Sequence, residues 1–189
     1  PRMAPQNRQP ETEVIRLRPG QLPYVSLTAD IFYRVLASEI AAQRGMYGTA
    51  ATTMIGLARD TGDPRLARRG LEFQLAGGNL PGALEAARVW ARLSPNDVEA
   101  SSTELALAAA NGQTKGLAQA LRNRIDASRD KPAAIGQALA VLSRLNDRRL
   151  ALRILDESLS DSVRKLPAAH LALADVASAS GDYERAAQE

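Results

Sequence analysis

The amino-acid sequence predicts an all-α protein, an α-α superhelix of about 4.5 two-helix units that follows an extended N-terminal segment. Residues that end helices recur at separations of 33, 34, 34 and 35 residues. Between successive breakers there is room for two helices of about 14 residues each, both with helical apolar spacing. We expect the stacked units to bury one continuous apolar seam. The breakers are Gly45, Gly78, Gly112, Asn146 and Gly181.

The N-terminal segment, residues 1–27, differs in composition from the rest of the chain. It holds five of the ten prolines and shows no helical apolar spacing. Such a segment is expected to be extended or disordered. The array then covers 28–189. Its expected units are 28–62, 63–96, 97–130, 131–165 and a truncated unit 166–189.

The expected helices follow in order, each with its own start or stop signal. Asp63 suits an N-cap and Pro64 a first helical position, where a missing N–H costs nothing. Pro132 and Pro167 mark later starts in the same way. Gly at a breaker, or Asn at position 146, is expected to leave the helix through a left-handed backbone. The predicted helices are 28–44, 47–61, 64–77, 80–93, 97–111, 114–128, 132–145, 147–160 and 167–180, and a further one begins at Asp182.

Composition and motifs argue against several classes of function. The chain has no cysteine, which excludes disulfides, thiol catalysis and cysteine-ligated metals. Its net charge of +3 comes from 24 basic and 21 acidic residues with interspersed signs. No phosphate loop or metal-ligand spacing occurs, and the lone His170 is expected to be a half-buried packing residue. We therefore expect no enzymatic activity, no cofactor and no metal.

The repeat period resembles that of the tetratricopeptide repeat (TPR) family. That family has a Gly-Asp-Tyr-like turn, an alanine where two helices cross, and a proline about seventeen residues after the glycine. The middle units depart from this pattern, because Leu117 stands at a crossing position and Arg124 at a core position. The matching residues are Gly45, Tyr47 and Ala50 in the first unit, Gly78, Leu80, Ala83, Trp90 and Pro95 in the second, and Gly181, Tyr183 and Ala186 in the fifth. Further departures are Leu71, Leu105, Leu139, Arg148 and Ser158.

The run from Leu27 to Asp97 more narrowly resembles the first repeats of TPR lipoproteins that Gram-negative proteobacteria export. This resemblance implies a lipid anchor upstream of the sequence, further repeats downstream, and a place on the periplasmic side of the outer membrane. Contact with a membrane is then expected only through that anchor. At least one such protein is an adaptor for a periplasmic carboxyl-terminal processing protease, which makes a similar role an expectation here.

The resemblance implies a binding surface for a protein or peptide on the concave wall, which the first helix of each unit supplies. The most specific feature is a group of three arginines whose spacing of three and four residues shares one helical face. They either bind a carboxylate or pair with nearby acids such as Asp60, Asp63 or Glu72, and simple pairing is favoured. The expected wall residues are Glu39, Gln43, Arg65, Arg68, Arg69, Glu72, Glu99, Ser102, Thr103, Gln137, Arg144 and Asp175.

Two further possibilities stay open at this stage. An RNA- or glycan-binding array is the alternative function, suggested by a pI near 9.6, although the scattered basic residues argue against nucleic acid. Self-association through exposed ends of the array is the other. Phe32 and Tyr33 have no preceding repeat to cover them, so they are expected to meet the N-terminal segment or another chain. At the other end we expect Leu171, Leu173, Val176 and Ala177 to be exposed if the helix that begins at Asp182 is short.

Overall fold

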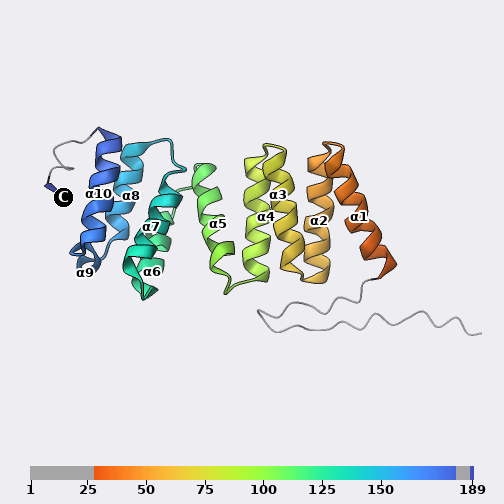
Figure 1. Cartoon of the computed structure of the whole chain (residues 1–189), viewed down its shortest axis with the longest axis horizontal. Helices are drawn as coiled ribbons and strands as arrows, with labels where there is room; N and C mark the ends of the chain where they lie inside the picture. The colour runs from red at the N-terminus through yellow and green to blue at the C-terminus, as the bar shows by residue number, and fades with distance from the viewer. Residues whose placement is uncertain (1–27, 182–187) are drawn as a thin grey trace, which may run out of the picture.

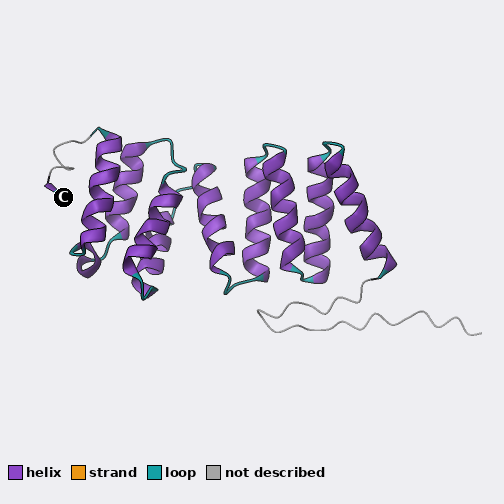
Figure 2. Cartoon of the chain, viewed as in Figure 1, coloured by secondary structure: helices purple, strands orange, loops and turns teal. Residues whose placement is uncertain are grey.

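The computed structural model describes residues 28–181 and 188–189, which form ten helices joined by short loops (Figure 1, Figure 2). The helices pack in sequential antiparallel pairs and lie side by side along the long axis of the molecule. The predicted all-α class is confirmed. The helices are α1 (Ala29–Gln43), α2 (Tyr47–Thr61), α3 (Pro64–Ala76), α4 (Leu80–Leu93), α5 (Val98–Ala110), α6 (Leu117–Ala127), α7 (Lys131–Leu142), α8 (Arg148–Ser158), α9 (Asp161–Arg164) and α10 (Pro167–Ser180).

Most helix boundaries agree with the sequence signals. The carboxylate of Asp63 accepts a hydrogen bond from the backbone N–H of Arg65 at 2.9 Å, and Pro64 is the first residue of α3. All four predicted glycine breakers have a left-handed backbone, so each helix ends in the way that the glycine predicts. Their φ angles are +78° at Gly45, +69° at Gly78, +73° at Gly112 and +82° at Gly181.

The fourth breaker works differently from the prediction. No non-glycine residue of the described ranges has a positive φ, so Asn146 does not adopt the left-handed conformation. Helix α7 ends at Leu142, three residues earlier than expected. The guanidinium of Arg148 donates to the carbonyl oxygens of Leu142 and Leu145 at 2.5 and 2.9 Å. A side chain therefore satisfies the carbonyls that the left-handed turn satisfies elsewhere.

Two other segments differ from their predicted ends. Helix α6 starts at Leu117 and not at 114, because Gly116 precedes it with a φ of +75°. Helix α8 ends at Ser158, two residues before the predicted end, and the short helix α9 follows it. Helix α9 was not predicted, because a segment of four residues is too short to show helical periodicity.

Small residues lie where the helices of the first units approach each other. The predicted crossing residues Ala50 and Ala83 are both fully buried. Gly70 of α3 is a further close approach: a Cβ there would lie 2.7 Å from Cγ1 of Ile55. Small side chains let paired helices pack at short interaxial distance.

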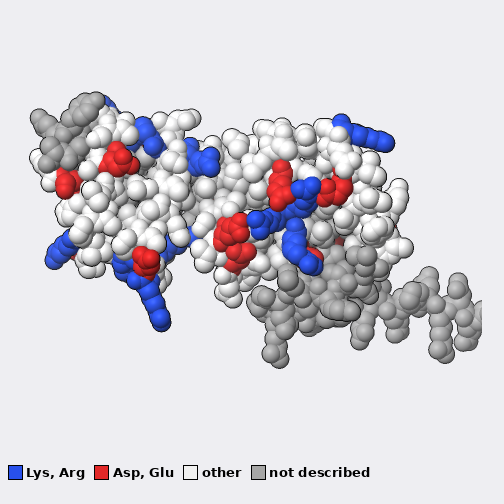
Figure 3. Space-filling model, in the orientation of Figure 1, with Lys and Arg blue, Asp and Glu red and all other residues white. Residues whose placement is uncertain are grey.

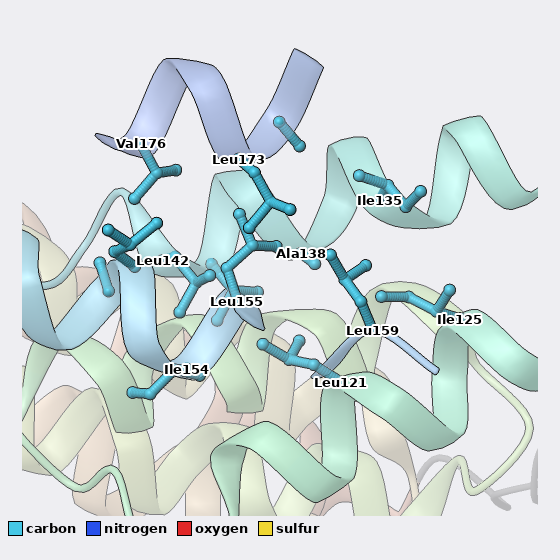
Figure 4. Packing of buried hydrophobic residues seen from close by; sticks show 14 of the residues in the cluster. Leu121, Ile125, Ile135, Ala138, Leu142, Ile154, Leu155, Leu159, Leu173 and Val176 are labelled. Carbon is cyan, nitrogen blue, oxygen red and sulfur yellow. The ribbon is translucent and has the colours of Figure 1, made fainter. Parts of the chain in front are cut away.

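The buried residues form two apolar clusters, which corrects the expectation of a single seam. The first, called the N-terminal core, includes Ala50, Met54, Phe73 and Trp90, and extends from Ala42 to Leu107. The second, called the C-terminal core, extends from Ala109 to Ala177. Figure 4 shows the close packing of large aliphatic side chains in the C-terminal core. Both clusters take residues from α5, which therefore lies at the boundary.

The helices on the two sides of α5 pack in different orders. From α1 to α5 each helix packs on its neighbours in sequence, so that α1 contacts α2, α2 contacts α3, α3 contacts α4 and α4 contacts α5. Beyond that point α5 packs on α7, α6 packs on α8, and α10 packs on both α7 and α8. Helix α5 contacts α4 and α7 more extensively than it contacts α6. The predicted pairing of 97–111 with 114–128 is thus the loosest of the array.

The C-terminal end is better covered than the sequence suggests. Leu173, Val176 and Ala177 are buried in the C-terminal core, because α10 packs on α7 and α8. Their predicted exposure is wrong, whereas Leu171 is 73% exposed. The predictions for 1–27 and for the helix expected to begin at Asp182 lie outside the described residues. Within the described ranges, every helix is too short or too polar to cross a bilayer.

Candidate functional site

A band of charged side chains lies on α1, α3 and α5, three helices that were expected to line the concave wall (Figure 3). Arg69 of α3 makes a bidentate pair with Glu39 of α1, with both N–O distances at 2.8 Å. Its remaining terminal nitrogen lies 2.6 Å from Glu72. Arg69 also lies over the ring of Phe73, 4.5 Å from the centroid. Arg69 is thus shared between two carboxylates of the band, those of Glu39 and Glu72.

The other two arginines of the cluster are paired as well. Arg68 lies 3.0 Å from Glu99 of α5 and 5.2 Å from the centroid of the Trp90 ring. Arg65 lies 2.7 Å from Asp63, which is 5% exposed. Two of these ion pairs connect helices about one repeat apart. Arg69 with Glu39 joins α3 to α1, and Arg68 with Glu99 joins α3 to α5. In this structure the arginines neutralise acids of their own chain and leave little excess charge for nucleic-acid phosphates.

The pairing changes the proton affinities of its members. The hydrogen bond from Arg69 lowers the pKa of Glu39 below its ordinary value, against a smaller opposing effect of burial. Hydrogen bonds to Glu39 and Glu72 raise the pKa of Arg69. Both side chains stay partly exposed, at 33% for Glu39 and 43% for Arg69. Solvent screening therefore keeps the contribution of this pair to stability small.

A groove of about 290 Å³ lies at the boundary between the two cores. Most of its lining is apolar, and two of the predicted wall residues, Thr103 and Arg144, contribute to it. Leu75 lies near the end of α3 and Leu80 is the first residue of α4, and they are 46% and 41% exposed. The full lining is Leu75, Leu80, Thr103, Ala106, Leu107, Ala110 and Arg144.

Arg144 differs from the three arginines of α3. It follows the end of α7, is exposed, and makes no ion pair within residues 28–181 and 188–189. A guanidinium at the edge of an apolar groove is suited to a carboxylate whose neighbouring atoms fill the groove. Among the arginines expected on the wall, Arg144 alone has no acidic partner within the described ranges, whereas Arg65, Arg68 and Arg69 are paired.

The apolar residues of this groove were not among the predicted wall residues. A usable signal was present, because Leu75 and Leu80 flank the Gly77-Gly78 turn, where large hydrophobic residues need a partner. The remaining wall residues lie elsewhere. Gln43, Gln137 and Asp175 are exposed on α1, α7 and α10.

Helix α5 also meets an arginine on the side of α6. Arg124 donates to the hydroxyl oxygens of Ser101 and Ser102 at 3.1 and 2.6 Å. Burial lowers the pKa of Arg124. Ser102, expected on the wall, therefore holds α6 to α5 in this structure. Arg124, which was expected at a core position, therefore lies between α5 and α6.

Other parts of the surface carry weaker candidates. A polar hollow of about 490 Å³ lies between α6 and α8, lined by residues that include Arg122, Arg153 and Glu157. An apolar hollow of about 370 Å³ lies on α1. His170 is half-buried, and its Nδ1 lies 2.7 Å from a carboxylate oxygen of Glu189.

A scan against protein-family models, a search of curated proteins and a search of solved structures each found no match to this chain.

Proposed function

We propose that the chain is a non-catalytic scaffold, a TPR-like superhelix that binds a polypeptide across the groove beside α5. The observation that carries the proposal is the combination of an apolar groove with one exposed arginine that has no acidic partner within the described ranges. The repeat period and the helix pairs support the superhelix. The resemblance to exported TPR lipoproteins adds the proposal of an adaptor on the periplasmic side of an outer membrane.

The groove defines the chemistry of the partner. Leu75 and Leu80 offer exposed aliphatic surface, so a partner gains affinity by burying an aliphatic side chain there. Arg144 then favours a carboxylate close to that side chain. We therefore propose that the partner segment combines a Leu-, Ile- or Val-type residue with an acidic residue. A volume of about 290 Å³ suits one or two such side chains and not a folded domain.

Selection from a displayed library of random peptides tests this proposal. The expected result is enrichment of peptides that place an aliphatic residue next to an acidic one. Arg144→Glu is expected to weaken the selected peptides by about tenfold, the loss of one charge-assisted hydrogen bond. Ala106→Trp, which fills the groove from α5, is expected to abolish binding. Affinities are measured by fluorescence anisotropy with labelled peptides.

Arg153→Glu is the matched control, because it makes the same charge change at an exposed position of α8. It is expected to leave the affinity unchanged. The proposal is wrong if no peptide is enriched, or if the enriched peptides bind wild type, Arg144→Glu and Ala106→Trp equally. Far-UV circular dichroism of each variant separates loss of binding from loss of fold.

A further inference from the structure

Helix α1 carries most of the large apolar surface that the structure leaves uncovered. Five of the nine exposed large hydrophobic residues in the described ranges lie on α1 or in the turn that follows it. Tyr33 is 69% exposed and Phe32 is 54% exposed. The other face of α1 packs on α2. An apolar patch of this kind at one end of a molecule marks an interaction site.

The uncovered face has a definite shape. Its hollow of about 370 Å³ is lined by Tyr33, Leu36, Ala37, Ile40, Ala41, Arg44 and Met46. Large side chains surround two alanines, so a second helix with large side chains can approach closely at the alanines. The hollow is mostly apolar, and a helix that covers it would remove this surface from water.

The residues on this face also follow one helical stripe. Asp30, Tyr33, Ala37, Ile40 and Arg44 are separated by three or four residues in alternation. This is the spacing at which one helix packs along another over several turns. Ala37 is the centre of the stripe. An acidic residue and a basic residue stand seven positions away on either side of it, each about 10 Å along the axis.

We propose that the exposed face of α1 pairs with the same face of a second copy of this chain, antiparallel, about a twofold axis at Ala37. In this register Asp30 of each copy faces Arg44 of the other, which gives two symmetric ion pairs. Tyr33 of each copy meets Ala41 of the other, a large side chain against a small one. A parallel pair would place Asp30 against Asp30 and Arg44 against Arg44, and like charges disfavour it.

The existing contacts of the two charged residues allow this pairing. Arg44 makes no ion pair within the described ranges. Asp30 lies 3.2 Å from Arg34, but both side chains are largely exposed, at 67% and 48%. An exposed pair one helical turn apart contributes little and does not prevent a second contact. In the proposed dimer the apolar residues supply the affinity and the charges fix the direction.

The interface is small, because each copy contributes one helix face. A dimer that buries less than about 1,200 Å² in total is a weak one. We therefore expect a concentration-dependent dimer with a dissociation constant on the order of 10 μM, about −7 kcal/mol. Sedimentation velocity of the full chain over a hundredfold range of concentration measures this equilibrium.

Charge reversal with mixing tests the register. Arg44→Glu alone places acid against acid, and Asp30→Lys alone places base against base, so each variant is expected to dimerise at least tenfold more weakly than wild type. An equal mixture of the two variants restores both ion pairs in the heterodimer. Recovery of dimer in the mixture is therefore expected. Dimers of each single variant as tight as wild type, or no recovery on mixing, would overturn the register.

A single cysteine tests the axis, since the chain has no cysteine of its own. Ala37→Cys places two thiols at the twofold axis and is expected to give a disulfide-linked dimer under mild oxidation. Ala140→Cys, at an exposed position of α7, is the control and is expected to stay mostly monomeric. Equal cross-linking of both variants, or a wild-type chain that remains monomeric at every concentration, contradicts the proposal.

Discussion

The N-terminal core has a larger share of alanine than the C-terminal core, and the helices around the two cores pack in different orders. Around the N-terminal core, α1 to α4 each pack on the next helix, with alanines such as Ala50 and Ala83 fully buried at the contacts. In the C-terminal core, aliphatic residues such as Ile125, Leu155 and Leu173 are fully buried. There α6 packs on α8, and α10 packs on α7 and α8.

The difference shows what small residues do in a paired-helix array. Leu117 occupies the position that corresponds to Ala50 and Ala83, and it is buried in the C-terminal core. Arg124 occupies the space between α6 and α5. Bulky side chains at these positions keep the two helices of the pair apart, so α5 packs on α4 and α7, and α6 packs chiefly on α8.

The largest expected effect comes from a cavity in the C-terminal core. Leu155→Ala removes a fully buried side chain and is expected to cost about 2–5 kcal/mol of unfolding free energy. Because the cores are separate clusters, the transition seen by Trp90 in the N-terminal core is expected to move less than that seen by circular dichroism. Trp90 is the only tryptophan, so its fluorescence reports one core alone.

Chemical denaturation followed by both probes measures this difference. Equal shifts of the fluorescence and circular dichroism transitions would show that the two cores unfold as one cooperative unit, and the distinction between them would then have no thermodynamic meaning.

A smaller effect is expected from overpacking the N-terminal core. Ala83→Leu inserts the residue that stands at the equivalent position 117, and it is expected to cost about 1–3 kcal/mol. Here the fluorescence of Trp90 is expected to report the full shift. Ala140→Leu, at an exposed position of α7, is the control and is expected to change stability by less than about 0.5 kcal/mol. A neutral Ala83→Leu would mean that small size at the crossing is not what orders these helices.

The smallest effect concerns the ion pairs of the N-terminal side. The pKa of Glu39 is lowered in the folded chain, so its contribution is present above its ordinary value of 4.5 and is lost as the pH falls through the lowered pKa. Glu39→Gln is expected to cost under about 1 kcal/mol at pH 7 and progressively less below pH 4.5. Urea denaturation between pH 7 and pH 3 measures the difference. In an Arg69→Met background the same substitution is expected to have no pH-dependent effect.

The sequence predicts the helices well where a local signal exists. Asp63 with Pro64, and glycines such as Gly78, act through their own backbone or the next few residues, so their effect can be read without tertiary structure. Arg148 shows the limit. It caps carbonyl oxygens three and six residues away with a long side chain, which replaces the turn expected at Asn146. Only the folded structure shows that Arg148, and not a left-handed turn at Asn146, satisfies these carbonyl oxygens.

The candidate site was less predictable, because it depends on residues far apart in sequence. Helical spacing alone placed Arg65, Arg68 and Arg69 near one another, but the partners Glu39 and Glu99 lie about 30 residues away. The groove draws residues from four segments between Leu75 and Arg144. Which helices meet around α5 depends on the packing order, and a periodic pattern carries no information on that order.

The groove beside α5 spans the boundary between the two cores, with Leu75 and Leu80 on one side and Arg144 on the other. A ligand that contacts both sides binds only when they stand at the correct separation. A bound ligand therefore stabilises the association of the two cores by its binding free energy. Local separation of the two cores, before the whole chain unfolds, is then expected to be rarer when the ligand is bound. Ligand binding in the groove and the association of the two cores at α5 are therefore coupled.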